Sequence, residues 1–142
     1  MQLKKPLKMS WKNFFKTGIL VVLTFNKLMA AAQQQPKRRD LLNAIVNQDI
    51  SVVEIKQVTI VRGQPVPKHL HPCPVVGYIV SGNVFFQIEG EESRILKEGD
   101  AFYKPKNKTI LHFDNTQKRK PLIFVAFYLK EKDEELIKII DD

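Results

Sequence analysis

Between residues 53 and 129 the sequence consists of short apolar and β-branched runs separated by turns rich in glycine or proline. The first run, Val53–Val61, alternates apolar with polar residues, and its β-branched side chains favour extended backbone. Arg62–Pro65 ends this run, and turns of similar composition follow later runs. Short strands at this spacing indicate a sandwich or barrel. We predict strands over residues 53–61, 75–80, 84–89, 93–96, 101–103, 110–113 and 122–129.

Helical periodicity is confined to the two flanks of this region. Asp40 can cap a short helix over residues 41–46, and residues 134–140 have the pattern of a short terminal helix. A length of 142 residues suits a single domain. We therefore expect a linker and short helix over residues 33–49, a β-domain over residues 50–130 and a helical tail over residues 131–142.

The first 32 residues differ in composition from the rest of the chain. They hold six lysines and no acidic residue, and their apolar segment Thr17–Phe25 is followed by Ala30–Ala32. A basic start, a short apolar segment and an Ala-x-Ala site are typical of a secretory signal peptide. We expect cleavage after Ala32, removal of residues 1–32, and a periplasmic or secreted protein.

Two alternatives to this leader are an uncleaved membrane anchor and a cytoplasmic amphipathic extension. The nine residues of the apolar segment span about 14 Å as a helix, whereas the hydrocarbon core of a bilayer is about 30 Å thick. We therefore expect no stable membrane anchor after cleavage.

The net charge of +8 first suggests a polyanionic partner such as nucleic acid. Six of the 23 basic residues belong to the leader, which leaves 17 against 15 acidic residues in the remaining chain. Few aromatic side chains accompany the basic runs at 104–108 and 118–120, and stacking aromatics are typical of proteins that bind single strands. Nucleic-acid binding is thus the weakest hypothesis, and we expect no nucleic-acid partner.

The three histidines carry the strongest chemical signal. On extended backbone His69 and His71 lie on one face, because successive strand side chains alternate. Neutral imidazoles are good ligands for Zn, Fe, Mn, Ni or Cu. His112, from a distant strand, could complete a set of three that leaves positions open for water or substrate. We predict a metal site at His69, His71 and His112.

Residues 63–82 resemble the first motif of the cupin family, G-x5-H-x-H-x3/4-E-x6-G. Gly63, His69, His71 and Gly82 stand at the corresponding places. The family's glutamate ligand maps to Val75, so the usual set of three histidines and one glutamate is not available by direct correspondence.

Residues 99–115 resemble the second cupin motif, G-x5-P-x-G-x2-H-x3-N. Gly99 and Pro105 match it, whereas Asn107 replaces a glycine and His112 lies two residues further from Pro105 than the motif requires. The resemblance covers roughly residues 50–129. It implies an all-β fold, a cupin barrel or jelly roll with one metal inside, and pairing of two copies through sheet edges as a homodimer. The short helices predicted above would flank this barrel.

Cys73 is the single cysteine and could replace the missing glutamate as a thiolate ligand, because alternation from His71 continues to it. Pro72 and Pro74 bracket it and disrupt regular strand pairing. The alternative is a thiol packed beside the pocket.

Two functions follow from the resemblance. The first is an exported metal-dependent enzyme, an oxygenase, isomerase or lyase, that transforms a small molecule in the barrel. The second is a non-catalytic cupin that binds a small ligand with or without metal.

Overall fold

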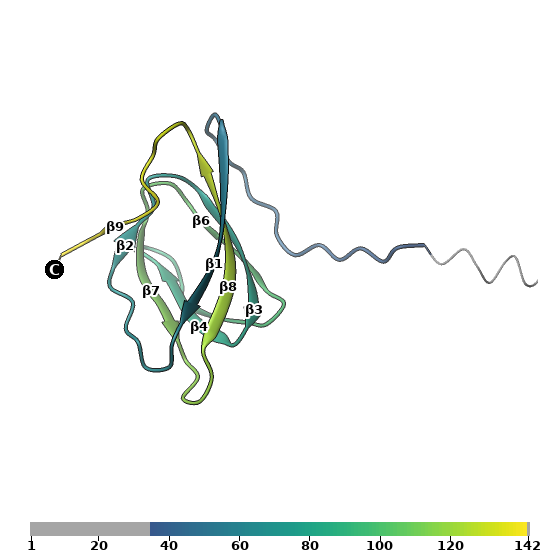
Figure 1. Cartoon of the computed structure of the whole chain (residues 1–142), viewed down its shortest axis with the longest axis vertical. Coiled ribbons are helices and arrows are strands. Elements are labelled where there is room, and N and C mark those ends of the chain that lie inside the picture. Colours follow the sequence, from purple (N-terminus) through teal and green to yellow (C-terminus); the bar gives the residue numbers. More distant parts are fainter. Residues whose placement is uncertain (1–34, 142) are drawn as a thin grey trace, which may run out of the picture. The chain divides into compact units, whose positions relative to one another are not determined.

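The computed structural model describes residues 35–141, and the predicted leader lies outside that range. Residues 40–141 belong to one compact unit, which holds all the strands of the described range (Figure 1). The described part of the chain has no helix that could cross a membrane. Its strands are β1 (Val52–Ile60), β2 (His69–Leu70), β3 (Val75–Ser81), β4 (Asn83–Ile88), β5 (Arg94–Lys97), β6 (Ala101–Lys104), β7 (Thr109–Asn115), β8 (Leu122–Lys130) and β9 (Lys138–Ile139).

These strands form two antiparallel sheets. One has the strand order β1-β8-β3-β6, and the other has the order β5-β4-β7-β2-β9. The longest pairing joins β1 to β8, from Val52 opposite Lys130 to Ile60 opposite Leu122. The all-β prediction is confirmed, and each predicted strand is found within a few residues of its expected bounds.

Aromatic rings fill the space between the sheets. Phe86, Phe102, Phe113 and Phe124 are buried and pack in edge-to-face or tilted pairs, with centroids of neighbouring rings 5.0–6.1 Å apart. Gly77 on β3 lies so close to the Phe102 ring that a Cβ at this position would overlap it. The absence of a side chain at residue 77 therefore lets the ring reach the centre of the core.

The predicted N-terminal helix over residues 41–46 is not formed. Residues 35–47 have no regular structure, and Ile45 is 87% exposed. Short helices depend on packing of an apolar face, which this segment lacks. Two hydrogen bonds attach this segment to the sheets. The Ile45 carbonyl accepts from the Tyr103 hydroxyl, and the side chain of Gln48, directly after the segment, donates to the Leu129 carbonyl.

The predicted C-terminal helix over residues 134–140 is also wrong. Residues 138–139 form β9, which pairs with β2, and the Ile140 amide donates to the Lys68 carbonyl. The backbone groups at the free edge of β2 are satisfied by a strand and would not be satisfied by a helix.

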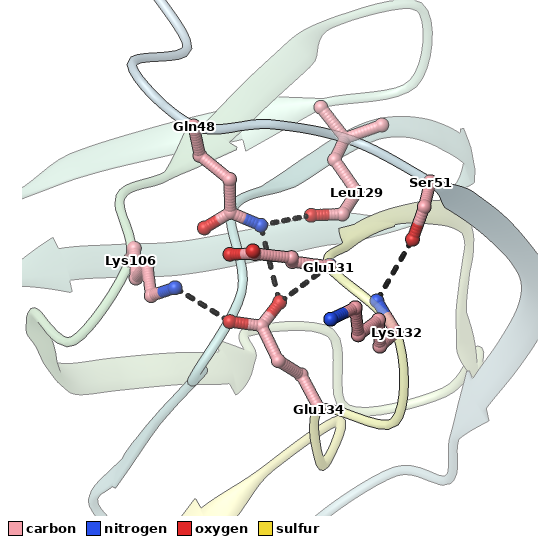
Figure 2. Close-up of polar contacts among 7 residues, drawn as sticks. All are labelled: Gln48, Ser51, Lys106, Leu129, Glu131, Lys132 and Glu134. Atoms are coloured by element: carbon pink, nitrogen blue, oxygen red, sulfur yellow. Dashed lines mark hydrogen bonds and ion pairs between the residues drawn. The ribbon is translucent and has the colours of Figure 1, made fainter.

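Glu134 fixes the start of this C-terminal segment. Its carboxylate accepts hydrogen bonds from the Gln48 side chain and the Glu131 amide, and it pairs with Lys106 (Figure 2). We call residues 131–140, which follow β8, the C-terminal strap. They contact the loop after β6 through the pair of Glu134 with Lys106, and they cover the edge of β2 through β9.

Candidate functional site

His69 and His71 lie together inside the domain. β2 runs between β7 and β9 and holds His69, and His71 directly follows this strand. The two side chains are 2% and 3% exposed, whereas Leu70 between them is partly exposed. The ring centroids are 5.1 Å apart in a T-shaped arrangement. The two imidazoles therefore lie side by side in the interior of the domain.

Backbone carbonyls set the tautomer of both rings. His69 Nδ1 lies 2.9 Å from the Pro67 carbonyl oxygen, and His71 Nδ1 lies 2.6 Å from the Leu136 carbonyl oxygen. Because a carbonyl can only accept, each Nδ1 carries the proton and each Nε2 keeps a lone pair. The Nε2 of His71 is buried and has no hydrogen-bond partner in residues 35–141.

Lys104 is the third polar group in this place. It is 4% exposed, and its Nζ lies 3.4 Å from His69 Nε2 and 3.8 Å from the centroid of the Phe113 ring. In the sequence Lys104 belongs to the basic run at residues 104–108, and its buried position beside the histidines was not predicted. Alternation along β6 contained the signal, because residue 104 shares the inward face with Phe102.

Burial controls the protonation of all three groups. Loss of solvent, with a smaller contribution from the Lys104 charge, lowers the pKa of His69 to about 4 and that of His71 to about 3. Burial also lowers the pKa of Lys104 to about 7. At neutral pH the site therefore has two neutral imidazoles beside an amine that is partly protonated.

The structure does not bring His112 to the other two histidines. Its side chain is exposed, lies 2.8 Å from the Asp114 carboxylate and packs against the Phe85 ring. A register shift in β7, between the pairs Gln87–His112 and Ile88–Ile110, turns the strand at this point. Ile110, which the motif spacing from Pro105 reaches, takes the inward position.

The donor set fits a metal poorly. Val75 and Ile110, at the family's glutamate and third-histidine positions, are both buried and apolar. Cys73 is buried, and burial raises the pKa of its thiol, which disfavours a thiolate. Among residues 35–141 no group of three or more histidine, cysteine or acidic side chains is placed to hold a metal ion.

The comparisons with known proteins agree with this fold. A model of the cupin domain matches residues 56–128. Similar solved structures include a cupin-like protein of Thermotoga maritima (22% identity, TM-score 0.52), the DMSP lyase DddQ of Ruegeria pomeroyi (20%, 0.51) and an oxalate decarboxylase of Bacillus subtilis (20%, 0.53). The matches cover 61–62% of this chain.

The same matches cover 64%, 42% and 24% of those three chains, so this protein corresponds to only part of each. No curated protein matches the sequence. The matched family model spans half of the chain, from β1 to β8, and includes both buried histidines. The chain belongs to the cupin domain family.

Proposed function

We propose that this cupin domain binds a small molecule at His69 and His71 inside the barrel. The observation that carries the proposal is the Nε2 of His71, a buried acceptor without a hydrogen-bond partner in the described chain. Leaving a buried polar atom unpaired costs free energy, about 1–3 kcal/mol. A ligand that supplies a donor to this atom recovers that cost on binding.

A screen of small polar compounds by ligand-observed NMR tests this proposal on the purified protein. We expect some compounds to bind the wild type and to lose binding in His71→Leu, which replaces the imidazole by an apolar side chain of similar volume. The control is His112→Leu, because His112 is exposed and away from the pair. Hits that bind the wild type and His71→Leu equally would contradict the proposal.

A divalent metal at His69 and His71 is the second candidate. One observation favours it: imidazoles that ligate a metal usually donate their other ring N–H to a carbonyl or carboxylate, as both rings do here. The oxalate decarboxylase of Bacillus subtilis is described with Mn(II) centres. Elemental analysis of the wild type and of His69→Ala/His71→Ala decides this candidate, because only a metal held by the pair would disappear from the double variant.

Catalysis is a further property that either candidate site, with or without metal, could have. The DMSP lyase and the oxalate decarboxylase among the similar structures are enzymes, which supports a role in small-molecule turnover. Any hit from the NMR screen that changes chemically with time, and does so only with His71 present, would support an enzyme.

We also propose that the protein acts outside the cytoplasm, in the periplasm or as a secreted protein. The basic, apolar and Ala-x-Ala pattern of residues 1–32 supports this proposal. Mass spectrometry of the protein from its native cells tests it: we expect a chain that begins at Gln33, and a chain that retains Met1 would contradict it.

A homodimer is supported by the outer face of the sheet β1-β8-β3-β6. A row of apolar side chains crosses all four strands, from Ile55 to Phe127, Val76 and Tyr103. Val53, Tyr78 and Val80 extend this face and are exposed. Contiguous exposed apolar surface is typical of interfaces, and two copies can cover the same face by two-fold symmetry.

A further inference from the structure

The strand register shows what replaces the family's metal ligands in this barrel. Val75, at the glutamate position, lies opposite Lys104 in the β3–β6 pair. Ile110, at the third histidine position, lies opposite His69 in the β2–β7 pair. The glutamate and the third histidine of the family are thus replaced by the apolar residues Val75 and Ile110. Lys104, the cross-strand partner of Val75, reaches His69 with its Nζ.

The charge of Lys104 has no counter-ion. Its recorded contacts are the His69 nitrogen at 3.4 Å and the rings of Phe113 and Phe102, with centroids 3.8 and 5.6 Å from Nζ. No carboxylate in the described part of the chain forms an ion pair with it. Burying an ammonium group is costly unless it is paired, so an anion that enters the site gains a strong partner.

The donors and acceptors of the site that remain without a partner in residues 35–141 define which ligand is complementary to it. Lys104 has three N–H donors, of which His69 Nε2 accepts one. His71 Nε2 can only accept, because its Nδ1 holds the ring proton. A complementary ligand therefore offers acceptor oxygens to Lys104 and one donor to His71. Because Lys104 Nζ lies 3.4 Å from His69 Nε2 and the ring centroids of His69 and His71 are 5.1 Å apart, the two ligand groups must be close together.

We infer that Lys104 takes the role of the metal cation in this barrel, and that the site binds a small hydroxycarboxylate anion without metal. The carboxylate lies against the Lys104 amine, and the neighbouring hydroxyl donates to His71 Nε2. His69 holds Lys104 in place through its own Nε2. This inference rests on the proposed function and names the chemical class of its ligand.

Three matched probes test the inference in the presence of EDTA: glycolate, acetate, which lacks the hydroxyl, and glycolamide, which lacks the charge. Calorimetry or NMR titration measures their affinities for the purified protein. We expect glycolate to bind at least tenfold more tightly than either of the others. Equal affinity for glycolate and glycolamide would overturn the inference, as would glycolate binding that EDTA abolishes and zinc restores.

Two variants connect the result to Lys104. Lys104→Met keeps the length of the side chain and removes its charge, so glycolate affinity should fall at least tenfold. The control is Lys108→Met, because Lys108 is exposed in the loop that follows β6, and this variant should leave the affinity unchanged. Val75→Glu keeps Lys104 and provides a carboxylate opposite it, so it should also weaken glycolate binding. Unchanged glycolate affinity in Val75→Glu and Lys104→Met would overturn the role of Lys104.

The inference and the proposed function can fail separately. One outcome is that neutral compounds bind in a His71-dependent way but glycolate does not bind. This outcome would support the proposed function and reject a hydroxycarboxylate as the ligand. Absence of any His71-dependent binding would reject both.

Discussion

Ile110 is the cross-strand partner of His69 in the β2–β7 pair, and both side chains are buried. An imidazole at residue 110 would therefore stand beside His69, a place that His112 does not reach. Because one extra residue in a strand changes the direction of the side chains that follow, the register shift in β7 separates His112 from the site.

The first prediction restores the family's ligand set. In the triple variant Val75→Glu, Lys104→Leu, Ile110→His, two imidazoles gain a carboxylate and a third imidazole, and the competing cation is removed. We expect it to bind one equivalent of a divalent metal such as Mn²⁺ or Zn²⁺. Metal titration followed by elemental analysis checks this, with Val75→Glu/Lys104→Leu as the matched control. A folded triple variant with no gain in metal affinity would mean that residues 75 and 110 do not face the histidine pair.

The second prediction concerns pH. The pKa of a histidine is about 6.5 in the unfolded chain, whereas it is about 4 for His69 and about 3 for His71 in the folded protein. Between these limits the unfolded state binds more protons, so the free energy of unfolding falls as the pH is lowered from about 6.5 towards 3. Lys104, the ring of Tyr128 and, more weakly, the charge of Asp114 are the neighbours that act on the pair.

Lys104 extends this dependence to alkaline pH. Its pKa is about 7 when folded against 10.5 when unfolded, so the free energy of unfolding rises further between pH 7 and 10.5. Urea denaturation at a series of pH values measures both effects. We expect His69→Leu/His71→Leu to flatten the acid part of the profile and Lys104→Met to flatten the alkaline part. A profile identical to that of the wild type in both variants would contradict these assignments.

The third prediction tests the contact between Gly77 and Phe102. Gly77→Ala forces a methyl group against a ring that Phe86, Phe113 and Phe124 hold in place, so we expect a loss of about 1–3 kcal/mol in the free energy of unfolding. Phe102→Leu alone should also destabilise, through the lost ring contacts. Combined, the two changes should cost less than the sum of the single ones, because the smaller side chain makes room for the methyl group. Full additivity in chemical denaturation would argue against the contact.

Alternation of side chains explains which parts of the structure could be predicted from sequence. The strands and the buried pair His69 and His71 follow from a period of two, which is a local property of the chain. His112 and the two flanks depend on contacts between distant segments. A one-residue irregularity in β7 reverses the direction of His112, and the free edge of β2 recruits residues 138–139 as a strand. Lys104 was missed because charge suggests an exposed residue, although its position in the alternation of β6 indicates an inward one.

The fourth prediction concerns the apolar outer face. Ile55 is 58% exposed on β1 and stands at the end of the row that crosses the sheet. If two copies pair through this face, Ile55→Glu buries a charge in the interface and should shift a dimer to a monomer with little change in fold. Ile95→Glu is the control, because Ile95 is a similarly exposed isoleucine on β5 of the other sheet. Sedimentation analysis measures the outcome, and a dimer that survives Ile55→Glu, or a monomeric wild type, would rule out this face.

The last prediction concerns entry to the site. The C-terminal strap provides the carbonyl of Leu136 that orients His71, and β9 covers the edge of β2. Because both histidines are buried, we expect a ligand to reach them when the strap moves. Glu134 holds the strap through Lys106, Gln48 and the Glu131 amide (Figure 2). Glu134→Gln removes the ion pair and weakens the acceptor, so we expect faster hydrogen exchange across residues 131–140 and faster association of any ligand of the pair.

Glu135→Gln is the matched control for this variant, because Glu135 is exposed and forms an ion pair with Lys138 on the strap itself. It should leave both rates near those of the wild type, since an exposed pair contributes little to stability. Hydrogen exchange followed by mass spectrometry measures the opening of the strap, and stopped-flow mixing with glycolate measures entry. Faster exchange in Glu134→Gln without faster association would show that ligands enter by another route; unchanged exchange would show that Glu134 does not hold the strap closed.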